Sequence, residues 1–458
     1  MVGSPPEIDV RVSYLLQNSG TINLSFIDVI FPDEKLYGRK NVHVEVDGRD
    51  IMPSKLPADL QQESPNALRI PLDPVWERKQ NRSVKIDYAF SSPSDEGARI
   101  TLGSDNFHLS SRGWLPLPQP PKRVLAPYPV RPLKTMYSVS VPHNFLVLAR
   151  GAAVGRKKNA GEIEYRYQLR KGDLPPFFVA GRYVESSAGR SGSLVSFWSL
   201  QPMMGDSAAT AAQRIAAAWS TLQKDFGPLD KALTGPHVVE APELGADKGG
   251  SDDRDKNSVV AFPGGALVRT NIWAGGLWND ELLLKINEAL ARSWFGEQMY
   301  PAPNAVIGLG EGLPNYATIV IAEATGGESA RRERVIEFLR AYEAAVKQGA
   351  GTSIAEKSIT VTMPYDPVLQ CRIARAKATL FFIALEDAYG EEPVRRALGE
   401  VVSLLRDQPV GYQDIRSALE QSTGKNLAEP FRTWLYNTGI PKDFHDRYLP
   451  ASAKISSQ

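Results

Sequence analysis

Residues 288–296 read EALARSWFG, and residues 310–316 read GEGLPNY. Apolar residues recur at helical spacing around both stretches, which predicts that each stretch belongs to a helix. Arg292 in the first stretch and Glu311 in the second are nineteen positions apart. The interpretation of the whole chain depends on these two stretches and on their spacing.

The first predicted helix has one charged face and one apolar face. Its charged residues fall at spacings of four, three and four positions: Glu281, Lys285, Glu288 and Arg292. Its apolar residues line the other side: Leu283, Ile286, Leu290 and Trp294. A charge ladder of this kind, taken by itself, favours a solvated helix face.

The two stretches resemble the aminopeptidase N family of zinc metallopeptidases. In that family one helix carries His-Glu-x-x-His directly before x-Trp-Phe-Gly, and a second helix carries the third zinc ligand in Asn-Glu-Gly-x-x-x-Tyr. The family's ligand Glu follows the second His by nineteen positions, which is the separation of Arg292 from Glu311. Three further segments are similar to family segments and occur in the same order: residues 138–151, 177–183 and 414–441.

The resemblance implies an α+β fold with two domains. Residues 1–188 are expected to form an N-terminal β domain of the saddle or sandwich type. Residues 189–458 are expected to form a mainly helical, thermolysin-like domain with a small sheet. The residues themselves agree, because β-type runs between turn residues prevail up to about residue 184 and helical spacing prevails afterwards. The small and polar segment Ser186 to Gly192 is the predicted boundary.

The expected elements follow from the same patterns. The clearest expected strands are residues 41–46, 84–90, 137–141 and 164–169, with 238–240 and 258–261 in the second domain. The expected helices cover residues 206–226, 279–295, 312–325, 329–347, 368–389 and 393–406, with two more before Gly439. The Pro-rich residues 115–132 form either a crossing between sheet layers or a surface loop.

The resemblance also exposes the loss of the zinc site. In the register set by Trp294-Phe295-Gly296, His-Glu-x-x-His becomes Glu288-Ala289-Leu290-Ala291-Arg292, so both histidine ligands and the general-base Glu are absent. A catalytic zinc needs three protein ligands and an open position, which Glu311 alone cannot supply. We therefore expect no metal, no other cofactor and no catalytic residue at this degenerate site, which comprises Glu288, Ala289, Arg292 and Glu311.

Two more positions depart from the family pattern. The family binds the substrate's free amino terminus through a Glu on a strand that corresponds here to Pro263, Gly264, Gly265 and Ala266. No acidic residue lies between Lys256 and Asn279, so this strand is expected to bind no α-ammonium group. Arg375 stands where the family's transition-state-stabilising Tyr is expected.

The replacement residues lead to a specific hypothesis. We expect the Arg292 guanidinium to occupy the zinc position and to bridge Glu288 and Glu311, with Arg375 completing a neutral cluster. Arginine suits this arrangement because its planar group can satisfy carboxylates on two sides, and a buried carboxylate without a partner is costly. Alternatively, these residues lie apart and bind ligand charges.

The remaining chemistry-bearing residues favour no second catalytic site. The five histidines are His43, His108, His143, His237 and His445. His237 begins a predicted strand and is expected to be structural. The single Cys371 excludes an internal disulfide and a cysteine-built metal site, and we expect it to be a small buried hydrophobe.

Composition excludes some partners. The 458 residues include 53 Lys and Arg against 52 Asp and Glu, a formal net charge of +1, so nothing proposes a nucleic-acid partner. No run approaches the roughly 18 apolar residues that span a bilayer, so we expect no membrane insertion. The first residues lack a signal-peptide pattern, and an extracytoplasmic location is expected if such a segment has been removed.

The sequence thus predicts a zinc-less, catalytically inactive aminopeptidase-like protein that binds a peptide or protein in the former active-site cleft. Four aromatic residues either contact that ligand or pack in the core: Trp273, Trp278, Tyr300 and Tyr316. The alternative is a hydrolase with an unrecognised site, or with a carboxylate-only site in which Glu288, Glu311 and another acid bind Ca²⁺ or Mg²⁺.

Overall fold

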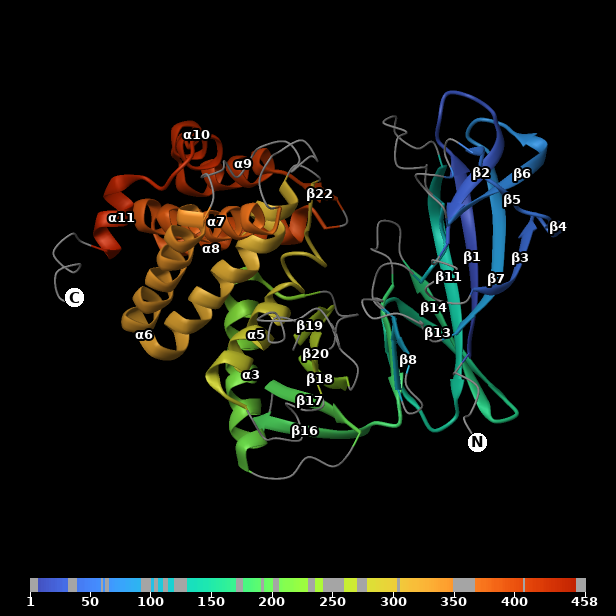
Figure 1. The fold of residues 1–458 in the computed structure, drawn as a ribbon, viewed down its shortest axis with the longest axis horizontal. Helices are drawn as coiled ribbons and strands as arrows, with labels where there is room; N and C mark the ends of the chain where they lie inside the picture. Colours follow the sequence, from blue (N-terminus) through green and yellow to red (C-terminus); the bar gives the residue numbers. More distant parts are fainter. Residues whose placement is uncertain are drawn as a thin grey trace.

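The computed structural model places a body of β-sheets beside a mainly helical body (Figure 1). The sheets come from the first part of the chain and the helices from the second part. The structure describes residues 7–31, 39–58, 61, 66–91, 100–102, 106–109, 114–118, 130–169, 176–190, 193–200, 206–229, 235–241, 259–269, 278–302, 305–348, 367–406 and 408–449. The α+β architecture expected from the sequence is confirmed.

The largest sheet is antiparallel and has the strand order β13-β14-β11-β1-β7-β3-β4. Its strands are β1 (Glu7–Asn18), β3 (Lys40–Val46), β4 (Arg49–Ile51), β7 (Asn81–Ser91), β11 (Val130–Pro142), β13 (Ala152–Asn159) and β14 (Glu162–Leu169). Every second residue of β1 from Ile8 to Leu16 is buried, so one face of the sheet covers the core. The four strands expected in the first domain are confirmed as parts of β3, β7, β11 and β14.

Two four-stranded sheets complete the core of the β domain. One has the order β10-β2-β6-β5 and the other β12-β15-β9-β8. Their strands are β2 (Leu24–Ile30), β5 (Ser54–Lys55), β6 (Ala67–Trp76), β8 (Ile100–Leu102), β9 (Asn106–Leu109), β10 (Leu117–Pro118), β12 (Leu146–Ala149) and β15 (Phe178–Gly181). Trp76, Trp114 and Phe178 are fully buried in this core. Within the Pro-rich stretch, residues 119–129 lie outside the described residues.

A fourth sheet, with five strands, belongs to the second part of the chain. Its order is β16-β17-β18-β20-β19, and its strands are β16 (Val184–Arg190), β17 (Ser193–Ser199), β18 (His237–Ala241), β19 (Val259–Phe262) and β20 (Gly265–Arg269). The three central strands run parallel, and the two edge strands run antiparallel to their neighbours. The two strands expected in the second domain are β18 and β19.

The segment predicted to link the domains is part of a strand. Residues 186–190 lie within β16, which pairs with β17 along its whole length. Small polar residues suit this edge position, because the side chains of Ser186 and Ser187 are exposed. The predicted boundary between residues 188 and 189 therefore falls inside β16, and we propose that the second domain begins at Val184.

The helices have the bounds α3 (Asp206–Phe226), α5 (Asp280–Ala291), α6 (Val306–Gln348), α7 (Pro367–Tyr389), α8 (Glu391–Leu404), α9 (Tyr412–Thr423), α10 (Ala428–Tyr436) and α11 (Lys442–Tyr448). The two helices expected at 312–325 and 329–347 are one element, α6, broken by the non-helical Gly327 (φ 71°, ψ −168°). The short strands β21 (Tyr300–Pro301) and β22 (Pro409–Val410) pair in parallel. None of the described helices has both the length and the apolar composition needed to span a bilayer.

Candidate functional site

The helix α5 presents Glu288 and Arg292 on one face. The side chain of Asn279 caps its first turn with a hydrogen bond of 2.9 Å from a backbone N–H. The helix ends at Ala291, but Arg292 keeps helical dihedral angles (φ −63°, ψ −18°). The Arg292 side chain therefore lies one turn after that of Glu288.

Close packing of α6 against α7 brings two more charged residues to the same place. A Cβ added to Gly312 would lie 2.6 Å from the Cβ of Ala378, so only glycine allows this approach. The Thr379 hydroxyl donates a hydrogen bond of 3.3 Å to the Gly312 carbonyl. Glu311, next to Gly312, and Arg375, one turn before Thr379, are positioned by this contact.

The Arg292 guanidinium lies between the carboxylates of Glu288 and Glu311. Its Nη2 is 2.9 Å from Glu288 Oε1 and 2.8 Å from Glu311 Oε2. Its Nη1 is 3.3 Å from Glu311 Oε1 and 3.2 Å from the Gly310 carbonyl oxygen. The contact expected from the nineteen-residue spacing is present, and it is bidentate toward Glu311.

Arg375 joins these residues from α7. Its Nη2 lies 3.0 and 2.9 Å from the two carboxylate oxygens of Glu288. Glu288 therefore accepts hydrogen bonds from two arginines. Together, Glu288, Arg292, Glu311 and Arg375 form the charge cluster, in which two acids balance two bases.

Asn315 is a fifth polar residue here, and its role is not predicted from the sequence. Its Nδ2 donates a hydrogen bond of 2.6 Å to the Glu311 carbonyl, one helical turn earlier. Its Oδ1 accepts a hydrogen bond of 3.0 Å from Arg375 Nη2. The only signal in the sequence is the four-residue spacing from Glu311, which many surface asparagines share.

The charge cluster is partly buried. The side chains of Glu288 and Arg292 are 20% and 28% exposed, and those of Glu311 and Arg375 are 37% and 38% exposed. Burial acts to lower the pKa of Arg292, but its hydrogen bonds and charge interactions with Glu311 and Glu288 outweigh burial and raise the pKa above its ordinary value. Arg292 is therefore a permanent cation between two carboxylates.

The segment expected as the amino-terminus-binding strand is a hairpin. Pro263 and Gly264 form the turn between β19 and β20, and only Gly265 and Ala266 lie in a strand. The prediction of a continuous strand is wrong here because Gly264 has a positive φ of 81°, a turn conformation. The Gly264 N–H donates a hydrogen bond of 3.0 Å to the Ser293 hydroxyl, which fixes the turn beside Arg292.

The four aromatic candidates separate into different environments. Tyr316 is completely buried between the rings of Phe226 and Phe382, so it packs in the core and does not contact a ligand. Trp278 packs against the core with its ring 5.8 Å from that of Phe197. Tyr300 is half-buried in β21. Trp273 lies outside the described residues.

Cys371 does not occupy the expected environment. It is exposed near the start of α7, so the prediction of a small buried hydrophobe is wrong. Cys371 lies in the first turns of α7, where its neighbour Arg372 is also exposed, so this part of the helix faces solvent. His237 begins β18 as expected, with its ring 6.1 Å from that of Trp198.

Comparisons with known proteins identify the architecture. No protein-family model matches the sequence, and no curated protein matches it either. Among solved structures, the M1 zinc metallopeptidase of Deinococcus radiodurans is 15% identical, with 95% of this chain and 91% of that chain aligned at a TM-score of 0.64. The chain has the fold of the M1 zinc metallopeptidases. This confirms the aminopeptidase N-type fold that the two helical stretches predict.

A second M1 structure shows how much of the architecture is shared. Legionella pneumophila aminopeptidase A, in complex with aspartic acid, is 15% identical over 91% of this chain, with a TM-score of 0.64. The alignment covers 46% of that longer chain. At 15% identity, the likeness to these M1 structures shows a shared fold and nothing beyond it.

The charge cluster does not fit the zinc ion of M1 metallopeptidases. It offers two carboxylates and two guanidinium groups, and none of the hydrogen-bond partners of these four side chains is an imidazole. Both oxygens of Glu311 already accept hydrogen bonds from Arg292. A divalent ion would have to displace a permanently charged side chain and would gain only carboxylate ligands.

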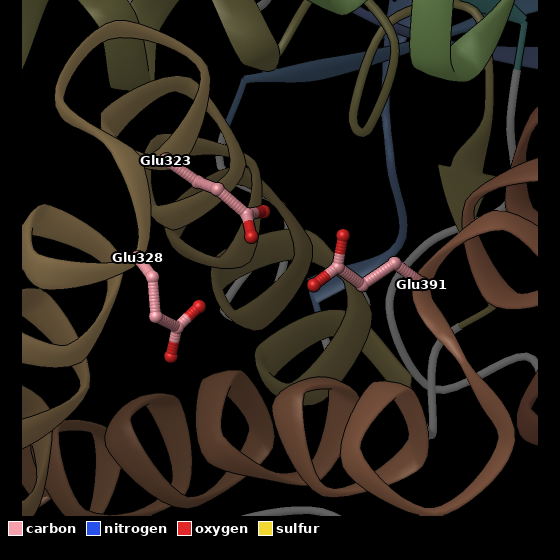
Figure 2. A group of neighbouring side chains, drawn as sticks. All are labelled: Glu323, Glu328 and Glu391. Atoms are coloured by element: carbon pink, nitrogen blue, oxygen red, sulfur yellow. The ribbon is translucent and has the colours of Figure 1, made fainter.

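One group of three acids among the described residues is close enough to share an ion (Figure 2). Its members are Glu323, Glu328 and Glu391, whose ligand oxygens lie within 4.8 Å of one another. Burial raises the pKa of Glu391; the Arg395 charge opposes this rise, and the Glu323 charge adds to it. No local sequence pattern reveals this group, because its members lie on α6 and α8, far apart in the chain.

Two arginines already neutralise these acids. Arg395 Nη2 donates a hydrogen bond to Glu323 and lies 3.4 Å from Glu391 Oε2. Arg331 Nη1 lies 3.9 Å from Glu328 Oε1. A metal ion at this group would compete with both guanidinium groups.

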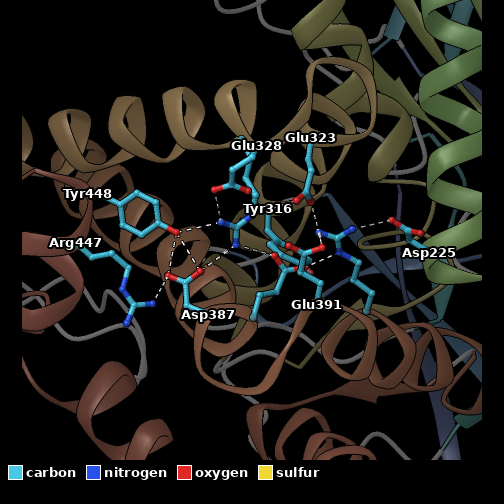
Figure 3. A network of polar contacts seen from close by, with 11 residues as sticks. Asp225, Tyr316, Glu323, Glu328, Asp387, Glu391, Arg447 and Tyr448 are labelled. Atoms are coloured by element: carbon cyan, nitrogen blue, oxygen red, sulfur yellow. Dashed lines mark hydrogen bonds and ion pairs between the residues drawn. The ribbon is translucent and has the colours of Figure 1, made fainter.

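The same arginines belong to a buried polar network (Figure 3). The Glu386 carboxylate, completely buried, accepts hydrogen bonds of 2.7 Å from Arg395 Nε, 3.2 Å from Arg331 Nη2 and 2.6 Å from the Tyr316 hydroxyl. Further members are Asp225, Asp387, Arg447 and Tyr448. The network ties α3, α6, α7, α8 and α11 together and is structural.

Proposed function

We propose that this protein is a pseudopeptidase, which keeps the M1 fold but lacks zinc and peptidase chemistry and binds a peptide or protein segment without hydrolysing it. The observation that supports this most directly is the Arg292 guanidinium between Glu288 and Glu311. The Arg292 side chain thus provides a positive charge at the position where the family resemblance implies a zinc ion.

The proposed loss of catalysis rests on the chemistry of the residues at the site. Peptide hydrolysis in this fold requires a metal-activated water and a general base. Arg292 is a permanent cation and cannot accept a proton. Glu288 accepts hydrogen bonds from two arginines, so its carboxylate oxygens are already engaged and do not face a free water position.

The proposed ligand follows from the solved M1 structures. A variant of the Deinococcus radiodurans enzyme is bound to the substrate Tyr-Ser-Ala, with 16% identity and 95% of this chain aligned at a TM-score of 0.65. Other structures of that fold hold single amino acids. We infer that this chain keeps a peptide-sized binding region beside the charge cluster, to which the half-buried Tyr300 contributes apolar contacts.

A second candidate function is hydrolysis through a carboxylate-only metal site. The group of Glu323, Glu328 and Glu391 favours it, because carboxylates prefer Mg²⁺ or Ca²⁺. The ion pairs with Arg331 and Arg395 oppose it. Glu391→Gln separates this candidate from the first, since it removes one acid of the group and leaves the charge cluster intact.

The test combines metal analysis, turnover and binding on the same preparation. We expect elemental analysis to find less than stoichiometric zinc, and we expect no release of fluorophore from aminoacyl and dipeptidyl substrates with or without added zinc. We expect saturable binding of short peptides in a fluorescence-anisotropy titration. Stoichiometric zinc together with turnover that a chelator abolishes would overturn the proposal. Turnover that requires Mg²⁺ and disappears in Glu391→Gln would establish the second candidate.

A further inference from the structure

Arg375 is held in one orientation by acceptors on two helices. Its Nη2 donates hydrogen bonds to both oxygens of Glu288 at 3.0 and 2.9 Å and to Asn315 Oδ1 at 3.0 Å, so the N–H groups of this nitrogen are engaged. Asn315 is itself fixed by its hydrogen bond to the Glu311 carbonyl. The plane of the Arg375 guanidinium is therefore set before any ligand arrives.

The rest of this guanidinium is available for binding. Toward the residues that the structure describes, Nε and Nη1 of Arg375 make no hydrogen bond, and the side chain is 38% exposed. A guanidinium presents its N–H groups in a planar fork that matches the two oxygens of a carboxylate. Arg375 thus offers a second, oriented edge to an anion.

The neighbouring hairpin lacks the opposite charge. No Asp or Glu lies between Lys256 and Asn279, a stretch that includes β19, the Pro263-Gly264 turn and β20. The turn is fixed to Ser293, next to Arg292, so a ligand beside the charge cluster meets no free carboxylate from this hairpin. An ammonium group of a ligand would have no carboxylate partner on this hairpin, whereas a carboxylate group of a ligand could pair with Arg375.

We propose that Arg375 binds a carboxylate group of the ligand, so that this protein selects peptides by a carboxylate and not by a free amino terminus. The inference rests on the proposed peptide-binding function and names its ligand chemistry. The carboxylate comes either from the peptide's C-terminus or from an Asp or Glu side chain.

The experiment uses three acetylated tripeptides and the full-length protein. The probes are acetyl-Tyr-Ser-Ala with a free C-terminal carboxylate, the same peptide as its C-terminal amide, and acetyl-Tyr-Asp-Ala amide. Binding is measured by isothermal titration calorimetry to the wild type, to Arg375→Gln and to Arg372→Gln. Arg372 is an exposed arginine on the same helix, three residues earlier, so the control removes an equal charge.

The expected result is a carboxylate preference that depends on Arg375. The wild type and Arg372→Gln should bind at least one carboxylate-bearing probe about tenfold to hundredfold more tightly than the uncharged amide, the range for a hydrogen-bonded charged pair. Arg375→Gln should bind all three probes equally. The probe with the advantage identifies whether the C-terminal or the side-chain carboxylate is bound.

The outcomes separate the two proposals. Equal binding of all probes by the wild type overturns the carboxylate inference and leaves peptide binding intact. No binding of any probe overturns both. Because Arg375→Gln also removes a partner of Glu288, its fold is checked by circular dichroism, and Arg375→Lys should retain part of the preference.

Discussion

At the scale of single residues, Arg292 joins carboxylates from two helices through one planar group. We expect Arg292→Met to destabilise the protein by about 1–2 kcal/mol, between the values for exposed and buried ion pairs, because Glu311 loses its bidentate partner. Urea unfolding measures the change. The control is Arg396→Met, which removes an exposed pair with Glu392 and should cost less than about 0.5 kcal/mol. Equal costs for the two variants would contradict a special role for Arg292.

A second prediction at this scale concerns the proposed former zinc site. Glu288→His combined with Arg292→His places two imidazoles one turn apart on α5, facing Glu311. We expect this variant to bind one Zn²⁺ per chain and to gain thermal stability from it, whereas the wild type does neither. Titration with Zn²⁺ and metal analysis after dialysis provide the measurement.

The matched control for this zinc prediction lies on the same helix. Glu281→His with Lys285→His gives the same four-residue spacing on the same charged face of α5, but about two turns before the charge cluster and so away from Glu311. It should bind Zn²⁺ more weakly, because it lacks the third ligand. If both pairs bound Zn²⁺ equally, the geometry around Glu311 would not be that of a former metal site.

At the scale of elements, the buried Lys377 ties α7 to the end of α10. Its Nζ donates a hydrogen bond to the Asn437 carbonyl, and burial lowers its pKa to about 8. The folded protein then binds fewer protons than the unfolded chain between pH 8 and the ordinary Lys pKa, so stability should rise with pH across that window. Buried tyrosines such as Tyr14, whose pKa burial raises, should reverse this trend above about pH 10.

The pH dependence is checked by urea unfolding at pH 7, 8, 9 and 10. Lys377→Met should remove the rise between pH 8 and 10 and should leave the stability at pH 7 unchanged or higher, because the cost of burying a charge disappears. A rise of the same size in Lys377→Met would show that other groups cause it.

The kink in α6 gives another prediction for this scale. Gly327 has φ 71° and ψ −168°, a conformation that only glycine adopts at low cost. We expect Gly327→Ala to destabilise the protein by about 1–3 kcal/mol. Gly155→Ala is the control, since a Cβ there meets no neighbouring atom within 4 Å and the backbone is not strained. Thermal unfolding of Gly327→Ala and Gly155→Ala measures the difference. Equal melting temperatures for the two variants would exclude backbone strain at Gly327.

Local patterns in the sequence predict most elements, but they do not predict contacts between distant elements. The amphipathic spacing of residues 279–295 leads to α5, whereas the Arg292 contact with Glu311 is expected only from the resemblance to the aminopeptidase N family, which shares the nineteen-residue interval. The turn at Gly264 is missed because the family resemblance places a strand over residues 263–266, although Pro263-Gly264 is by itself a turn signal. The contact of Tyr316 with Glu386 spans 70 residues, and no local pattern reveals it.

At the scale of the whole molecule, the β domain and the helical domain share a hydrophobic cluster. Phe177, next to β15, packs its ring 5.2 Å from that of Phe262 at the end of β19, and both side chains are buried. Arg150, after β12, also forms an ion pair with Glu297, five residues beyond Arg292. The two domains therefore support each other through apolar and charged contacts.

This shared cluster predicts cooperative unfolding. Phe262→Ala should cost about 3–5 kcal/mol, as for large buried aromatics, and should move a single calorimetric transition of the full chain to lower temperature. Val154→Ala, an exposed change in β13, should leave that transition in place. Two separate transitions, of which only one moves, would contradict the coupling.

The position of Arg292 has a consequence for the conditions under which the protein keeps its shape. The positive charge between Glu288 and Glu311 is part of the polypeptide, so it is present from the moment of synthesis and no chelator can extract it. With the proposed zinc-less site, we therefore expect the protein to fold as readily in a cell starved of transition metals as in a well-supplied one.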